Sequence, residues 1–290
     1  MLKTNIANLK NSVNMLTTTP LARNYKNIQS LEYVVDYIKN KFSTYNIFHS
    51  EQIWEINNDI YKNVIASFNP KHKSRLIIGA HYDVCNDYPG ADDNASGIAG
   101  LLELSRIIMS ENPNINYGID FVAFSLEEPP FFGTEFMGSH IHAKSIIDNK
   151  IDVIGMVCLE MIGYFSDEPN SQSYPFPEFN LIYPNIGNFI SVACIEKYSD
   201  FNNNLFSSME NKYIDVQLFQ LPDENDLVGL SDHRNYWKYD IPSIMITDMA
   251  FLRNSNYHTE YDTIDTLNFE KMAEVVDSIY NGIINLRNNK

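Results

Sequence analysis

The sequence predicts an α/β fold, a three-layer sandwich built on a mixed, mostly parallel central sheet. Three observations lead to this prediction. Short apolar segments alternate with longer segments of helical periodicity along the chain. Several strand-like segments are almost wholly apolar, as in a sheet that helices cover on both sides. The 290 residues, 44% of them hydrophobic, suffice for one large domain.

The first half of the chain should supply two helices and half of the sheet. A helix is expected at 30–42, where apolar residues recur on one face and Ser30 can cap the first turn. The apolar segment 97–109 predicts a buried helix. The strand-like segments are 46–54, 61–68, 75–80 and 121–126. About the first 30 residues are expected to form a helical extension or packing segment of a single domain that spans residues 1–290.

The second half continues the alternation around one irregular segment. Residues 165–184, rich in Pro, Asn, Ser and aromatic residues, predict a long loop or excursion. The helices are expected at 134–147, 186–197, 232–239 and 268–286. The strands are expected at 152–159, 213–220 and 243–247.

Composition narrows the function classes. The net charge of -16 disfavours nucleic acid as a partner, because an acidic surface repels phosphate backbones. No run of about 18 apolar residues predicts a membrane span, and residues 1–16 lack the apolar centre of a signal peptide. We therefore expect a cytoplasmic protein, although a leader removed beforehand would leave the same sequence. Neither a GxGxxG nor a P-loop motif is present, which disfavours nucleotide cofactors.

The cysteines point to the same compartment. Cys85, Cys158 and Cys194 form no CxxC pair and are odd in number. This sparse usage fits a reducing compartment better than a disulfide scaffold. We interpret all three as buried thiols.

Six acidic and imidazole side chains carry the functional prediction. Each stands at the end of an apolar run or in a turn near one, where an α/β sheet presents its ligand-binding edge. Two imidazoles, three carboxylates and one further carboxylate are what a paired zinc site with a general base requires. They are His81, Asp93, Glu127, Glu128, Glu160 and His258.

The segments IIGAHYDV and GADDNASG contribute the first two. His81 ends a strand, and Asp83 can accept the other ring N–H and fix the tautomer. Asp93 precedes a helix, whose N-terminus favours an ionised carboxylate. Each residue alone also fits an ordinary role, a solvated histidine or a helix-capping turn.

The remaining candidates follow two further strands and a polar loop. Glu127 and Glu128 follow an apolar strand and should point in opposite directions, so that one can bind metal while the other reaches a water. Glu160 is the only charge in an apolar stretch. His258 lies in the loop before the last helix. A solvated glutamate pair, a buried ion pair and a solvated histidine are the respective alternatives.

Together, the segments HYD, GADDNASG, EE, LEMIGY and HTEYDT resemble the M28 family of co-catalytic zinc aminopeptidases over about residues 61–287. The resemblance implies the zinc-exopeptidase fold and two Zn²⁺ per chain. One ion would be held by His81, Asp93 and Glu160. Asp93 would bridge to the second ion, held by Glu128 and His258. It also implies a cis peptide at Asp93–Asn94.

The resemblance further implies the catalytic roles. Glu127 would be the general base for a zinc-bridging hydroxide that attacks the N-terminal peptide bond, and Asp83 would orient His81. Tyr257 is either an oxyanion donor or a packed aromatic residue. Asp262 or Asp265 could support His258. Three carboxylates and one hydroxide would neutralise two zinc ions.

The chain departs from the family pattern after Glu128, where four residues lengthen the loop. An apolar pocket favouring hydrophobic first residues is expected from Phe131, Phe132, Met161 and Tyr164. The substrate would be a peptide with a free N-terminus. A single-zinc glutaminyl cyclase-like acyltransferase and a catalytically inactive binding module are the alternatives. A carboxypeptidase or another amidohydrolase on the same site also stays open, because the pocket determines the substrate.

Overall fold

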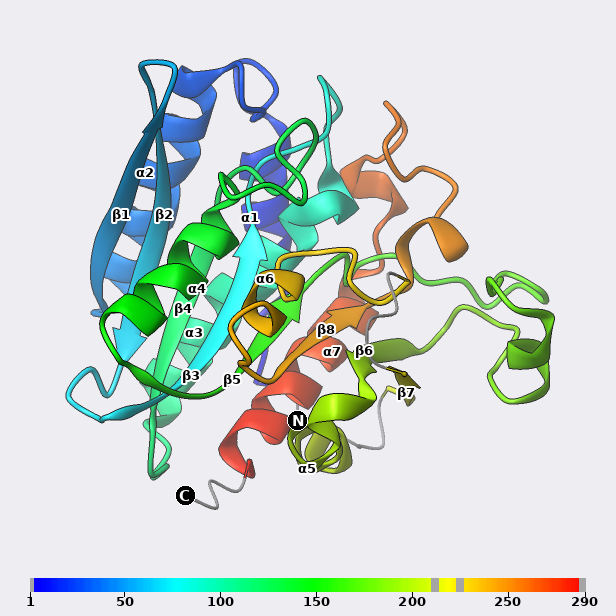
Figure 1. Ribbon diagram of the computed structural model, residues 1–290. Coiled ribbons are helices and arrows are strands. Elements are labelled where there is room, and N and C mark those ends of the chain that lie inside the picture. The colour runs from blue at the N-terminus through cyan, green and yellow to red at the C-terminus, as the bar shows by residue number, and fades with distance from the viewer. Residues whose placement is uncertain (1–2, 210–213, 223–226, 287–290) are drawn as a thin grey trace.

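The computed structural model describes residues 3–209, 214–222 and 227–286, and these residues contain an eight-stranded central sheet (Figure 1). The strands follow the order β1-β2-β4-β3-β5-β8-β6-β7 across the sheet. Their bounds are β1 (Phe48–Ile56), β2 (Asp59–Phe68), β3 (Ser74–His81), β4 (Gly118–Phe124), β5 (Asp152–Leu159), β6 (Ile190–Ile195), β7 (Val216–Leu221) and β8 (Ser243–Thr247).

The sheet is mixed, with a parallel centre. Strands β4, β3, β5 and β8 are neighbours and run parallel, so their carboxyl ends share one edge. The β1–β2 hairpin joins β4 antiparallel, and β6 joins β8 antiparallel while pairing parallel with β7. The expected mixed, mostly parallel sheet is confirmed.

Helices cover both faces and give three layers (Figure 1). One face carries α2 and α3, with α1 and α7 packed on α3 and α5 on α7; α4 and α6 cover the other face. The bounds are α1 (Ile6–Thr17), α2 (Ile28–Thr44), α3 (Gly97–Glu111), α4 (Gly138–Asp148), α5 (Ser199–Met209), α6 (Arg234–Trp237) and α7 (Phe269–Ile284). Alternate strand residues feed opposite layers: Ile78 belongs to one apolar cluster and Ile77 to the other.

One expected helix is wrong. Residues 190–195 form β6, whose six side chains are all buried, whereas we expected a helix at 186–197. A short apolar run rich in β-branched residues fits a fully buried strand as well as a helix, and here pairing with β7 and β8 decides. The helix of this region, α5, follows the strand. The expected strand at 213–220 begins at Val216, and residue 213 lies outside the described residues.

The expected cap of the helix at 30–42 is also wrong. Helix α2 begins at Ile28 with Asn27 in the capping position, and Ser30 is buried within the first turn. The other expected elements agree within a few residues at their ends, as is usual for boundaries read from sequence.

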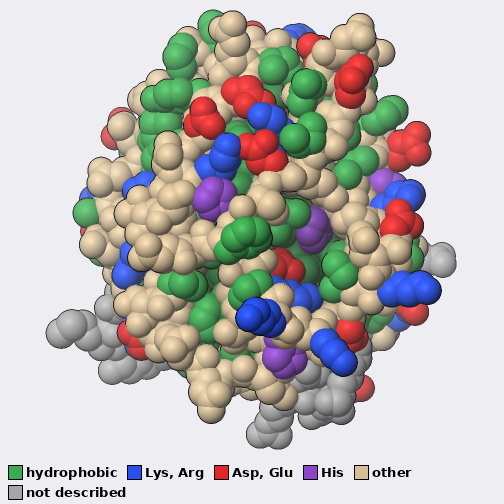
Figure 2. All heavy atoms as spheres, turned by 90° about the vertical axis from the view of Figure 1, so that its left-hand side faces the viewer, with side chains coloured by type: hydrophobic (Ala, Val, Ile, Leu, Met, Phe, Trp, Pro, Cys, Tyr) green, Lys and Arg blue, Asp and Glu red, His purple; other side chains and the backbone are tan. Residues whose placement is uncertain are grey.

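Two further observations concern the surface. None of the helices in residues 3–209, 214–222 and 227–286 has the length and apolar character needed to cross a bilayer. On the face seen in Figure 2, lysine and arginine side chains are scattered among acidic, apolar and other side chains.

Candidate metal centre and substrate pocket

The parallel centre of the sheet brings the candidate residues to one edge. His81 is the last residue of β3, and Glu160 directly follows β5. Glu127 and Glu128 follow β4 by a short turn, while His258 lies in the loop beyond β8. Asp93 comes from the turn that precedes α3. Segments spread over 178 positions therefore meet because four neighbouring parallel strands end together.

Asp93 lies between the two imidazoles. One of its carboxylate oxygens is 3.4 Å from Nε2 of His81, and the other is 3.0 Å from Nε2 of His258. The nearest oxygen of Glu160 is 3.3 Å from His81, and that of Glu128 is 3.3 Å from His258. The arrangement separates the donors into two groups that share Asp93.

The donor groups fit divalent metal ions. The candidate ligand atoms of His81, Asp93 and Glu160 lie within 4.8 Å of one another, and so do those of Cys85, Glu128 and His258. Oε1 of Glu128 is buried without a hydrogen-bond partner among the described residues, which is costly unless a cation satisfies it. Imidazole and carboxylate donors suit zinc and similar ions.

Three side chains of the GADDNASG turn hold the backbone around Glu160 by hydrogen bonds. The sequence did not reveal this role. Asn94 accepts the amide N–H of Met161 (3.0 Å) and donates to the carbonyl of Leu159 (2.9 Å). Ser96 accepts the N–H of Ile162 (3.0 Å), and Asp92 accepts that of Gly163 (3.0 Å). The segment around Glu160 is thus held along its backbone. The Asp93–Asn94 peptide is cis, as the resemblance implies.

Two carboxylates support the site through backbone N–H groups. Asp83 accepts from the amides of Glu127 and Glu128, each at 3.1 Å, and its Oδ1 lies 3.6 Å from Nδ1 of His81. Asp262 accepts from the amides of Asp92 (2.8 Å) and Asp93 (3.1 Å). Asp262 therefore supports the Asp93 turn, rather than His258 as the sequence suggested.

The site segments adopt sparsely populated backbone conformations. Leu126, Met161 and His258 have φ values of 63°, 50° and 53°, in the left-handed region that non-glycine residues rarely occupy. Leu126 precedes Glu127, and Met161 follows Glu160. Such conformations gather at functional sites, where the surrounding structure holds them.

The pKa shifts reflect concentrated buried negative charge. Burial, together with Glu128, Glu160 and Asp232, raises the pKa of Glu127 well above its ordinary value. Although burial opposes it, hydrogen bonds to Asp93 and Glu128 raise the pKa of His258 to about 10. These shifts reflect a concentration of negative charge that attracts cations, and a bound cation would lower the pKa of the carboxylates again.

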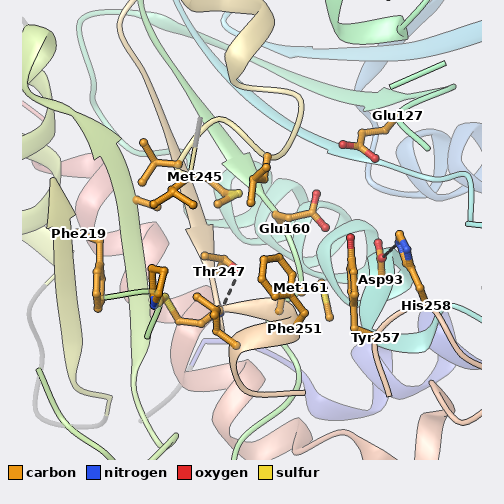
Figure 3. A pocket seen from close by; sticks show the side chains of 18 of the residues that line it. Asp93, Glu127, Glu160, Met161, Phe219, Met245, Thr247, Phe251, Tyr257 and His258 are labelled. Atoms are coloured by element: carbon orange, nitrogen blue, oxygen red, sulfur yellow. Dashed lines mark hydrogen bonds and ion pairs between the residues drawn. The ribbon is translucent and has the colours of Figure 1, made fainter. Parts of the chain in front are cut away.

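Tyr257 stands at the entrance to this group. Its ring stacks on that of His258, with centroids 3.8 Å apart, and its phenol points toward the side where Glu160 and Asp93 lie (Figure 3). Burial and the neighbouring carboxylates, Asp93 foremost, raise its pKa far above the ordinary value, so the phenol keeps its proton. A protonated phenol is a hydrogen-bond donor.

An apolar pocket of about 230 Å³ opens from the carboxylates toward β7 (Figure 3). Glu160 and His258 stand at one end and Phe219 at the other, with Met245 and Thr247 between them. Phe132 and Met161 line it as expected. Phe131 and Tyr164 are not among its lining residues; Phe131 instead packs against Tyr25, Tyr61 and Phe136. None of the described residues that line the pocket is a lysine or arginine.

Two further buried residues lie beside the site: Arg23, for which the sequence held no signal, and Asp232, which we expected from the segment SDHRNYW to be structural or pocket-lining. Arg23 is buried and donates to the carbonyls of Tyr82 (2.8 Å), Pro89 (2.6 Å) and Gly90 (2.5 Å). Asp232 is fully buried, and burial raises its pKa to about 7. Arg23 lies 58 positions before His81, so only the fold could place it here.

Comparison with protein families decides the class of this site. The model of peptidase family M28 matches residues 63–283. The chain belongs to peptidase family M28. Members of this family are peptidases, hydrolases that act on peptide bonds, and the family is generally zinc-dependent. The residues of both candidate metal-binding groups lie within the matched segment.

Individual M28 relatives agree with this membership. The Escherichia coli protein YfbL is 41% identical over 280 residues, which cover 93% of this chain and 85% of YfbL. Leucine aminopeptidase 1 of Ajellomyces dermatitidis is 27% identical over 224 residues, 73% of this chain. The match spans about half (52%) of that aminopeptidase.

Solved structures share the fold. The Legionella pneumophila aminopeptidase LapA superposes with a TM-score of 0.75 at 19% identity, covering 98% of this chain and 72% of LapA. The glutaminyl cyclase of Fimbriiglobus ruber superposes with a TM-score of 0.71 at 18% identity, covering 99% and 97%. At these identities the likeness concerns the fold alone.

Proposed function

We propose that this M28 peptidase is a metal-dependent aminopeptidase that removes the N-terminal residue of peptides. Two zinc ions would be held by His81, Asp93 and Glu160 and by Asp93, Glu128 and His258. The observation that carries the proposal is the position of Asp93 between His81 and His258, with Glu160 and Glu128 beside them, at one end of an apolar pocket. Bound ions would lower the pKa of a water molecule and polarise the scissile carbonyl.

The protein's own groups perform the proton transfers. Glu127 Oε2 lies 3.8 Å from His81 Nε2. In our proposal it accepts the proton of the attacking water and passes it to the leaving amine. The phenolic hydroxyl of Tyr257 donates a hydrogen bond to the oxyanion that develops on the scissile carbonyl.

Charge favours an N-terminus over a C-terminus in the pocket. An α-ammonium group is attracted by Glu127, Glu128 and Glu160, whereas a C-terminal carboxylate would need a cationic partner. The described pocket lining offers no lysine or arginine for that purpose. These observations support an aminopeptidase over a carboxypeptidase.

The pocket also supports a substrate class. Beyond the carboxylates, His258 and Tyr257, the lining is apolar apart from Thr247, so a hydrophobic first residue would bury its side chain there. We therefore propose peptides with a free N-terminus and a hydrophobic first residue as substrates. The three cysteines are free thiols, which supports a reducing compartment such as the cytoplasm.

Hydrolysis of aminoacyl arylamides tests this function. Leucyl arylamide should be cleaved at least about tenfold faster than the aspartyl and lysyl compounds, since an apolar pocket discriminates by about 1–3 kcal/mol. Acetylated leucyl arylamide should resist, because its α-ammonium group is blocked. Chelation should abolish turnover, and added Zn²⁺ should restore it.

The same assay separates the alternatives. Cyclisation of an N-terminal glutamine with release of ammonia, and no hydrolysis, would show that the protein is a glutaminyl cyclase and not an aminopeptidase. Faster cleavage of the blocked or the charged substrates would refute the proposed pocket. Absence of turnover with both metals bound would favour the binding module.

A further inference from the structure

The second donor group contains a thiol. Sγ of Cys85 and the candidate ligand atoms of Glu128 and His258 all lie within 4.8 Å of one another. Cys85, Asp93, Glu128 and His258 together line a small cavity next to the main pocket. Nothing in the sequence distinguishes Cys85 from Cys158 and Cys194, and only the fold places it beside the candidate metal ligands.

The loop that carries Cys85 is held firmly. Arg23 donates to the carbonyls of Tyr82, Pro89 and Gly90, on both sides of the cysteine. Asn24 donates to the carbonyl of Asn86 and to Oδ1 of Asp87. The contacts between the N-terminal segment and this loop therefore hold the thiol in position.

The cavity beside the thiol contains an unsatisfied acceptor. Glu128 is 4% exposed, and its Oε1 has no hydrogen-bond partner among the described residues. The thiol sulfur accepts a long hydrogen bond, 3.6 Å, from Nδ2 of Asn86. A buried carboxylate oxygen, an imidazole nitrogen and a sulfur that face one small space are the donor set of a soft or borderline metal ion.

We propose that Cys85 is a third kind of ligand, a thiolate, to the metal ion that Glu128, His258 and one oxygen of Asp93 would hold. The inference rests on the proposed metal centre. Zinc bonds to sulfur at about 2.3 Å and to nitrogen at about 2.0–2.1 Å, so both atoms on one ion stand at most about 4.4 Å apart. A small contraction of the observed group reaches that spacing. On binding, the S–H bond gives way to a sulfur–metal bond, and the proton passes to solvent.

Burial and the surrounding carboxylates, Glu128 foremost, raise the pKa of the Cys85 thiol to about 12, so a bound metal ion would have to displace its proton. The buried guanidinium of Arg23 interacts electrostatically with Asp262, Asp93, Asp83 and Glu128. Its hydrogen bonds go to the backbone carbonyls of Tyr82, Leu16, Pro89 and Gly90. The sulfur donor would favour zinc over magnesium, calcium or manganese at this position.

Cobalt(II) provides a direct test, because thiolate ligands give Co²⁺ an intense near-ultraviolet charge-transfer band that oxygen and nitrogen ligands lack. The metal-free protein is titrated with Co²⁺ alone, and absorption and bound metal are measured for wild type, Cys85→Ser and Cys194→Ala. Cys194 is a buried thiol on β6 and serves as the matched control.

We expect the band in wild type and in Cys194→Ala, at no more than one thiolate-ligated ion per chain, and its loss in Cys85→Ser. The serine variant should still bind Co²⁺ at both sites, one of them on the order of tenfold more weakly. Two bound ions in wild type without the band would overturn the inference and leave the proposed function standing. Failure of wild type to bind Co²⁺ would overturn both.

Discussion

At the scale of single residues, Asp83 holds the backbone of both glutamates that follow β4. Its two oxygens accept the amide N–H groups of Glu127 and Glu128, and it is 1% exposed. Asn at this position has one carbonyl oxygen, and its NH₂ group would face an amide donor. We expect Asp83→Asn to lower kcat by about 10–100-fold and to weaken metal binding, as loss of a supporting group does.

The matched control is Asp87→Asn, an exposed carboxylate of the same loop that accepts from Asn24. Its asparagine oxygen can accept the same hydrogen bond, so kcat and metal affinity should stay near wild type. Equal effects of the two substitutions, measured by steady-state kinetics and metal titration, would show that Asp83 does not support the site specifically.

His142 makes stability depend on pH. It is buried on α4, with Nδ1 2.7 Å from the Tyr236 hydroxyl, and burial lowers its pKa from 6.5 to about 4. A depressed imidazole pKa stabilises the fold fully above pH 6.5, and this contribution is lost as pH falls toward 4, because the unfolded chain binds the proton first. Nearby Asp120 opposes the shift.

We therefore expect wild type to lose about 2 kcal/mol more unfolding free energy than His142→Asn between pH 7 and pH 4.5. Asn keeps a polar group for Tyr236 and does not titrate. Denaturant unfolding at both pH values measures the difference. Identical losses in the two proteins would contradict the buried neutral imidazole.

The residues that the sequence could reveal are those in recognisable segments. His81, Glu127, Glu128 and Glu160 stand at strand ends, where a functional reading is natural. Arg23 could not be found, because it acts through backbone carbonyls about 60 positions away. The side chains of Asp92, Asn94 and Ser96 were visible only as a turn, since their partners belong to the segment after β5.

At the scale of elements, the start of α3 must approach β5 closely. A Cβ on Gly97 would lie 2.5 Å from Oδ1 of Asn94 and 2.7 Å from the carbonyl oxygen of Leu159. We expect Gly97→Ala to destabilise the protein by about 1–3 kcal/mol and to reduce metal affinity, because the backbone next to Glu160 must move. Thermal unfolding and metal titration measure both effects.

Gly229→Ala is the matched control, because the nearest atom to its Cβ is a Trp237 ring carbon at 3.3 Å. We expect a smaller loss of stability and unchanged metal affinity. If Gly97→Ala behaved like this control, the close packing of the Asp93 turn against β5 would not matter for the site.

Element prediction succeeded where periodicity and length agreed. The long amphipathic segment that forms α7 fits only a helix, and the apolar run that forms β5 was correctly predicted as a strand. The six residues of β6 are buried on both faces, and their pattern alone does not distinguish a strand from a buried helix. Pairing with β7 and β8, a property of the sheet, decides that segment.

At the scale of the whole molecule, the N-terminal segment belongs to the core. Leu9, Val13 and Leu16 of α1 are fully buried, and α1 packs against α3 and α7. Asp277 of α7 accepts the amide N–H groups of Lys3 (2.7 Å) and Thr4 (3.0 Å). We propose that residues 1–290 fold as a single peptidase domain in which this segment packs onto the body.

Deletion of residues 1–27 should therefore abolish cooperative unfolding rather than trim a dispensable extension. The deletion exposes an apolar surface and removes Arg23 from the loop that carries Cys85. Circular dichroism during heating measures the outcome. The substitution Leu9→Ala, expected to cost about 2–5 kcal/mol, is a milder version of the same test. A truncated chain that unfolds cooperatively near the wild-type temperature would refute the single-domain proposal.

The alternation of segments predicted the layers of the molecule, but the strand order could not be predicted from it. The order places β3 between β4 and β5, with β8 next, and this adjacency brings His81, the glutamates and the loop of His258 to one edge. The order depends on crossovers and on pairing between distant strands, which local patterns do not encode.

Metal content and leucyl arylamide hydrolysis, measured together on wild type and on Glu127→Gln, test the central claim most directly. The account predicts two metal ions per chain in both proteins, turnover by wild type, and a loss of at least about 100-fold in the variant. A variant that keeps wild-type turnover, or a wild-type chain that is active with no bound metal, would contradict it.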